Sequence, residues 1–254
     1  VRYRPPPMAA SSRLQRLVDA LTRPNRPASA APVEIVGANG GLAGFVVSAL
    51  SQELSRTLVA VVPTEARARE LTRSASFFLP PGDGDFEPVS LFSALDHAPF
   101  QGMSPSRLNV MERVATLFRL VHRLDLSLLV VPAPALLDRL MPGSTLESCA
   151  RLVAEGERFD REGFLRWLAE AGYHPVDTVE DPGTFAIRGG LIDVFVPLYD
   201  QPLRIELWGD EVDSIRRFDA LSQRTTSKVA GVYVCPARDI LFNDASVRRA
   251  RRAV

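Results

Sequence analysis

The sequence predicts an α/β chain with two domains: a parallel-sheet domain, followed by a smaller α+β domain with an antiparallel sheet. In the first half, apolar segments alternate with helical patterns, starting with 33–36, a glycine loop, a helix over 42–55 and a strand over 58–63. In the second half, short alternating segments follow one another at hairpin spacing, with one helix among them. This change of spacing sets the predicted domain boundary at residue 147.

Composition limits the classes of function. The 254 residues include 30 basic and 30 acidic ones, so no overall positive field favours nucleic acid. The sequence shows no apolar run near the roughly 18 residues of a membrane span and no signal-peptide pattern, which predicts a cytoplasmic protein without a membrane partner. Cys149 and Cys235 are too few for a disulfide framework. The histidines have no metal-ligand spacing, so we expect neither a metal nor another cofactor.

The other elements of the first domain follow from periodicity and capping signals. Residues 1–30, rich in Pro, Arg, Ala and Ser, are predicted to form a flexible tail, and the parallel-sheet domain covers 31–147. Ser104 or Ser106 can cap a helix that starts at Leu108. After the strand 58–63 we expect a helix with Arg67, Arg69 and Arg73 outward, a strand at 89–95, a helix at 108–124, a strand at 126–131 and a helix at 134–140.

The second domain is predicted over 148–236, and 237–254 belongs to a further, arginine-rich segment that starts a helix. Its helix, 160–171, is amphipathic, and Trp167 on it is assigned to the core. The strands are expected at 151–153, 176–179, 184–188, 191–196, 203–208, 212–218 and 229–234.

The glycine loop after segment 33–36 contains Gly37, Gly40, Gly41 and Gly44. A phosphate-binding P-loop needs a lysine for the β and γ oxygens and a Ser or Thr for magnesium. Residues 42 and 43 are Leu and Ala, and Lys228 is the only lysine of the chain. The GxGxxG dinucleotide pattern is absent as well. We therefore expect a non-functional phosphate loop and no catalytic activity in this chain.

The strand 203–208 carries the most unusual side chain of the sequence. Its alternation places Leu203, Ile205 and Leu207 on one face and Arg204, Glu206 and Trp208 on the other, before a Gly209-Asp210 hairpin signal. Arg188 likewise leaves the apolar side of its strand. Arg with Trp is the pairing enriched at binding hot spots, so Arg188, Arg204 and Trp208 form the candidate partner-binding site. In the alternative interpretation, Arg204 pairs with Glu206 or a neighbouring acid and Trp208 caps a small satellite core.

Several motifs resemble one bacterial protein family. The segments PGTFAIRGGLIDVFVP, PLRIELWGDEVDSIRRFD, SQRT and VYVCPARDIL, with APFQGMSPS and ERVATLFRL before them, are similar to the amino-terminal region of the transcription-repair coupling factors (Mfd). The resemblance implies a degenerate RecA-like domain 1A at 31–147, a domain 2 at 148–236 and the start of domain 1B at 237–254. Excinuclease subunit UvrB shares a related module but has a working P-loop, so the missing lysine favours the coupling factors.

The resemblance also implies a partner. Domain 2 of the family binds UvrA, through residues that fall here on Arg188, Arg204 and Trp208, and we hypothesise that an acidic strip on UvrA receives the two arginines. Trp208 stands where the family usually has Phe, and Val196 where a proline is usual. The resemblance places RNA polymerase and DNA contacts, and a translocase motor, outside this chain, and it implies masking of domain 2 by the rest of the parent factor. A UvrB-like fragment that binds ATP or DNA is the competing interpretation.

Overall fold

The computed structural model describes residues 33–54, 56–79, 85–95 and 104–241, and the single positions 16, 18, 19, 248 and 251. Most of the predicted tail 1–30 and of segment 237–254 lies outside the described residues. The described chain folds into two compact units. The first contains the described residues up to Ala94 and those of Arg123–Asp138, and the second contains those of Leu95–His122 and those from Arg139 onward.

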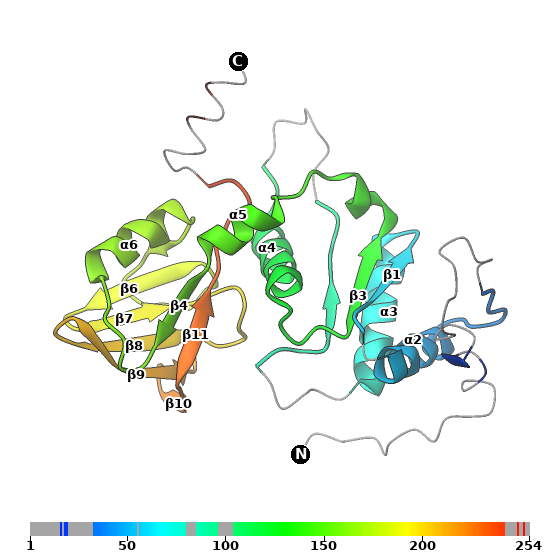
Figure 1. Ribbon diagram of the computed structural model, residues 1–254, viewed down its shortest axis with the longest axis horizontal. Coiled ribbons are helices and arrows are strands. Elements are labelled where there is room, and N and C mark those ends of the chain that lie inside the picture. The colour runs from blue at the N-terminus through cyan, green and yellow to red at the C-terminus, as the bar shows by residue number, and fades with distance from the viewer. Residues whose placement is uncertain are drawn as a thin grey trace. The chain divides into compact units, whose positions relative to one another are not determined.

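The first unit is built on a three-stranded parallel sheet with helices α2 and α3 packed on it (Figure 1). The central strand β3 pairs in parallel with β1 and with β2, which confirms the parallel sheet expected for the first half. The elements are α2 (Gly41–Leu54), β1 (Leu58–Val62), α3 (Glu65–Phe78), β2 (Val89–Leu91), β3 (Leu128–Pro132) and a 3₁₀ helix, η1 (Ala133–Leu137).

The core of this unit lies between β3 and helix α3. Leu128 and Val130 are fully buried against small residues of the helix, among them Ala68 and Ala75.

Segment 33–36 does not form a strand, so that prediction is wrong. A four-residue segment, here Val-Glu-Ile-Val, is too short to specify strand pairing by periodicity alone. The helix expected at 134–140 is the shorter η1.

In its described residues, the second unit combines helices with a six-stranded sheet, ordered β10-β9-β8-β7-β6-β5, and a separate antiparallel pair of β11 with β4 (Figure 1). Its helices and first strand are α4 (Arg107–His122), α5 (Gly143–Cys149), β4 (Arg151–Ala154) and α6 (Arg161–Glu170). The remaining strands are β5 (His174–Pro175), β6 (Thr184–Arg188), β7 (Leu191–Val194), β8 (Leu203–Trp208), β9 (Glu211–Phe218), β10 (Thr225–Val229) and β11 (Gly231–Val234).

Three elements of this unit differ from the expectation. The strand predicted at 176–179 is replaced by the two-residue β5, which pairs in parallel with β6. Helix α5 begins at Gly143, directly after Pro142, and its seven residues show no strong periodic pattern. Strand β10, with the polar sequence TTSKV, carries no apolar alternation and is held by its pairing with β9. Pairing with a neighbour, which no local pattern reports, decides both strands.

The two faces of the six-stranded sheet differ. On the core face, Ile192, Ile205 and Ile215 lie in register across β7, β8 and β9, and all three are fully buried. On the other face, here called the outer face, a small cluster covers part of the surface. This cluster consists of Val179, Ala186, Phe195 and Phe218. The rest of the outer face carries charged side chains together with Leu191, Ser214 and Trp208, and the candidate site lies there.

Helix α6 begins where Asp160 accepts a hydrogen bond from the Gly163 amide at 3.0 Å. It buries Phe164 and Leu168. Trp167, assigned to the core, is half-buried, with the Arg151 guanidinium carbon 5.3 Å from its ring. The helix therefore presents an apolar face to the unit, and the polar residues of its first turn remain accessible.

Candidate protein-binding site

The turn between β8 and β9 presents Trp208 to solvent. Gly209 adopts a φ of +61°, which favours glycine, and the chain reverses through Gly209 and Asp210 as the sequence predicted. The ladder shifts register between Glu206 and Leu207, next to the turn. Trp208, opposite Glu211, remains 83% exposed. The indole does not cap a satellite core, so that part of the alternative interpretation is wrong.

Arg204 lies on the same outer face but is paired within the sheet. Its cross-strand partner on β7 is Asp193, and Nε and Nη2 donate to Oδ1 and Oδ2 at 2.7 and 2.8 Å. The guanidinium carbon also lies 4.5 Å from the centre of the Phe218 ring. The hydrogen bond to Asp193 raises the pKa of Arg204, which keeps the guanidinium charged. A neighbouring acid therefore neutralises Arg204, as the alternative proposed, and the acid is Asp193 rather than Glu206.

Arg188 ends β6 and is exposed. Its Nη2 donates to the Asp177 carbonyl at 2.7 Å and to Thr178 Oγ1 at 3.3 Å, two uncharged acceptors. These bonds orient the guanidinium and leave its charge available. The register places Arg188 level with Glu206, two strands away, which corresponds to about 10 Å.

Sequence reasoning missed two residues of this face, Asp193 and Arg216. Asp193 sits in the apolar strand 191–196, and its charge is 2% exposed. Arg216 lies directly opposite Arg204 on β9 and pairs with Glu206 at 3.5 Å. A charged residue inside an apolar strand was the available signal for Asp193. Its partner could not be named before the β7–β8 register was known.

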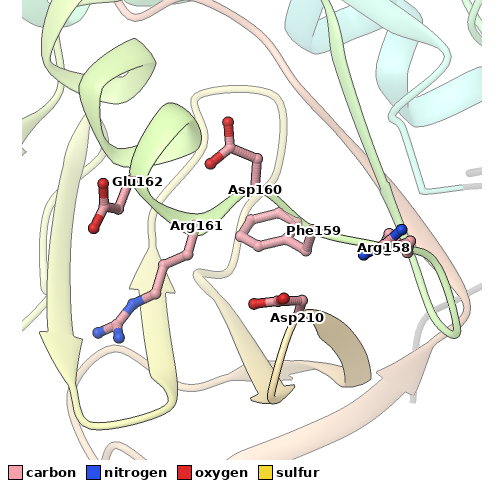
Figure 2. A pocket seen from close by; sticks show the side chains of 6 residues that line it. All are labelled: Arg158, Phe159, Asp160, Arg161, Glu162 and Asp210. Carbon is pink, nitrogen blue, oxygen red and sulfur yellow. The ribbon is translucent and has the colours of Figure 1, made fainter.

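An open depression of about 660 Å³ lies beside the β8–β9 turn (Figure 2). Figure 2 shows the Phe159 ring above Asp210, with Arg161 extending toward the β6–β7 turn. Arg161 Nη2 donates to the Gly189 carbonyl at 2.7 Å, next to Arg188. The depression mixes both signs of charge, and the lining residues are Arg158, Phe159, Asp160, Arg161, Glu162 and Asp210.

The glycine loop of the first unit forms a turn into α2. Gly37 and Gly40 have φ values of +85° and +53°, Gly41 opens the helix, and a Cβ on Gly44 would come within 2.2 Å of Ser74 Oγ. A small hollow of about 250 Å³ beside it contains Arg67 and Glu70, which pair with each other at 2.8 Å. Its lining includes neither a lysine nor a Ser or Thr. Close helix packing explains Gly44 without a phosphate.

Two properties of the described residues bear on other functions. Among them, no three Cys, His, Asp or Glu side chains gather in a way that could hold a metal ion. No helix in the described part of the chain is both long and apolar enough to cross a membrane.

Comparison with known proteins defines the class of the second unit. Residues 152–240 match the UvrB interaction domain family, a range that includes every strand of the six-stranded sheet and all three candidate residues. The outer-face site therefore lies within the segment that matches the UvrB interaction domain family.

Most of the chain is similar to transcription-repair-coupling factors, which confirms the resemblance seen in the motifs. It is 38% identical over 222 residues to the factor of Myxococcus xanthus, covering 87% of this chain and 18% of that protein. The Escherichia coli factor is 33% identical over 153 residues, or 60% of this chain and 13% of that protein. UvrABC system protein B of Thermosipho africanus is 23% identical over 87% of this chain and 34% of its own length.

Proposed function

We propose that this chain is a non-catalytic recruiting module of a transcription-repair coupling factor that binds UvrA through the outer face of its six-stranded sheet. The observation that carries the proposal is Trp208, 83% exposed on a face that also bears Arg188, inside the region matching the UvrB interaction domain. A large aromatic left in water beside an oriented arginine is the composition of a binding hot spot.

The three proposed contact residues play different parts. Trp208 supplies the anchor, because burying an indole gains more contact area than any other side chain offers. Arg188 supplies a positive charge for the partner, because its hydrogen-bond acceptors, the Asp177 carbonyl and Thr178 Oγ1, are uncharged. Arg204 keeps one terminal nitrogen, Nη1, for the partner, since Asp193 occupies the other two nitrogens. An acidic strip on UvrA facing Arg188 and Arg204 satisfies this arrangement.

We propose that the first part, 31–147, is a degenerate RecA-like domain, that 148–236 is domain 2, and that 237–254 starts domain 1B. Parallel pairing of β1, β3 and β2, with a glycine loop leading into α2, supports the first assignment. Leu42 and Ala43, at the positions of the P-loop Lys and Ser/Thr, support the absence of phosphoryl transfer. The described structure groups α4 and 139–147 with the second unit, whereas the proposed domain 1A includes them.

The proposed role is in transcription-coupled nucleotide excision repair, since the relatives are named transcription-repair-coupling factors. The chain spans less than a fifth of the length of those relatives. RNA polymerase binding, DNA translocation and masking of the UvrA-binding face by the remainder of the parent are therefore proposed for segments outside this chain.

A binding titration with purified UvrA tests the proposal. We expect Trp208→Ala to weaken binding by about 2 kcal/mol, roughly 30-fold, and Arg188→Glu to do the same through charge reversal. Leu221→Ala is the matched control, because Leu221 is 91% exposed in the same unit and lies on no part of the proposed site. Unchanged affinity in both variants, with wild-type binding intact, would refute the site.

One comparison favours a second function. The likeness to UvrABC system protein B covers 87% of this chain and raises the possibility of nucleotide binding at the glycine loop. Calorimetric titration with ATP and magnesium distinguishes the two functions. Saturable binding that Gly40→Asp abolishes would favour the UvrB-like function, and the missing lysine and hydroxyl predict none.

A further inference from the structure

Three neighbouring strands of the six-stranded sheet each place one cation on the outer face. Arg204 of β8 lies directly opposite Arg216 of β9, which in turn lies directly opposite Lys228 of β10. Like charges in direct opposition destabilise a sheet, so such a row needs compensation. Each cation has its own carboxylate, and in the same order these are Asp193, Glu206 and Glu155.

The three ion pairs differ in strength. Arg204 makes two short bonds to Asp193, and the two side chains are only 19% and 3% exposed. Lys228 approaches Glu155 to 2.7 Å. Arg216 and Glu206 are 3.5 Å apart, with side chains 42% and 40% exposed. The Lys228 and Glu155 side chains are similarly solvated, at 56% and 37% exposed, so it is the longer distance that makes Arg216 the cation of the row that most easily exchanges its partner.

Glu206 is divided between two donors. Its Oε2 is the atom paired with Arg216, and the same oxygen accepts a hydrogen bond from Ser214 Oγ at 3.2 Å. If Arg216 left, Glu206 would therefore keep a hydrogen bond to Ser214 and remain half-solvated. Releasing Arg216 costs little at the carboxylate side.

The position of this pair connects it to the proposed site. Glu206 lies two residues before Trp208 on the same face of β8, about 7 Å away along the strand. Arg188 is level with Glu206 on one side, and Arg216 lies on the adjacent strand on the other side. Glu206 is thus flanked by two exposed cations beside the exposed indole.

We propose that Arg216 is a further partner-binding residue, and that a carboxylate of the partner replaces Glu206 as the ion-pair acceptor of its guanidinium. This inference rests on the proposed function, because the partner is the same UvrA-type protein. Arg216 gains a charge-assisted bond that the 3.5 Å pair with Glu206 does not supply. Arg204 would gain less from a partner carboxylate, because its Nε and Nη2 already donate to both carboxylate oxygens of Asp193.

The test compares Arg216→Gln with Lys228→Gln in a UvrA titration. Both variants remove one positive charge from the same row of the same face, so a general loss of charge affects them equally. We expect Arg216→Gln to raise the Kd about tenfold or more, as for loss of a hydrogen bond to a charged group, and Lys228→Gln to raise it less than about twofold. Circular dichroism and urea midpoints verify that both variants fold.

A third variant distinguishes replacement of Glu206 by a partner carboxylate from simple attraction between Arg216 and the partner. Glu206→Gln removes the internal competitor, so we expect it to tighten UvrA binding severalfold, and we expect this gain to vanish when Arg216→Gln is added. Equal effects of Arg216→Gln and Lys228→Gln on the Kd would overturn the inference, and so would weaker UvrA binding by Glu206→Gln.

Trp208→Ala, measured alongside these variants, separates the inference from the proposed function. If Trp208→Ala weakens UvrA binding and Arg216→Gln does not, the proposed function stands and the role of Arg216 is wrong. If the wild-type chain does not bind UvrA, the proposed function and the role of Arg216 both fail.

Discussion

The buried pair between Asp193 and Arg204 gives a sharp prediction about stability. Asp193→Asn leaves the Arg204 guanidinium 19% exposed with an uncharged neighbour, and Arg204→Met leaves the Asp193 carboxylate 3% exposed with no cation. Breaking a buried pair from one side costs about 3–5 kcal/mol, because the remaining charge is left uncompensated. Since the arginine is the more exposed partner, we expect about 2 kcal/mol for Asp193→Asn and about 3–4 kcal/mol for Arg204→Met.

The double variant Asp193→Leu/Arg204→Met provides the control. Replacing both charges by apolar groups of similar size is often nearly neutral, so we expect its free energy of unfolding to lie within about 1 kcal/mol of the wild type. Urea unfolding, followed by tryptophan fluorescence and circular dichroism, measures all three variants. If Arg204→Met is no less stable than the double variant, the carboxylate is not held by this arginine and the assignment of Asp193 is wrong.

Two further predictions concern titrating groups. Desolvation of the His174 ring, with the nearby positive charges of Arg107 and Arg238, lowers its pKa below 6.5 although the residue is exposed, so as the pH falls the unfolded chain binds this proton at a higher pH than the folded chain does. Stability should therefore fall as pH drops below about 6.5, and this slope should be smaller in His174→Gln when urea midpoints are compared across that range. Burial raises the pKa of the Cys235 thiol to about 12, so a thiol reagent at pH 8 should label it only at the rate of unfolding. Rapid labelling of the folded chain would contradict its burial.

Some features of the candidate site could be predicted from local sequence patterns, and others could not. Alternation along 203–208 was sufficient to place Arg204 and Trp208 on one face, since side chains alternate across a strand whatever its neighbours. The Gly209-Asp210 turn was equally predictable, because its chemistry is local. The sequence could not predict that Asp193 accepts the hydrogen bonds of Arg204, because that contact depends on which residues of β7 and β8 lie opposite each other.

The sequence by itself determined the alternation of strands and helices, the change from parallel to antiparallel spacing, the lack of a P-loop lysine and Ser or Thr at positions 42 and 43 of the glycine loop, and the exposure of an aromatic beside a turn. All of these depend on residues close together in the chain. Only the tertiary structure decided that Arg204 is neutralised while Arg188 keeps its charge, and that Arg216 shares a long ion pair with Glu206. The physical reason is that the availability of a charge depends on its nearest opposite charge, and strand register brings that charge from elsewhere in the sequence.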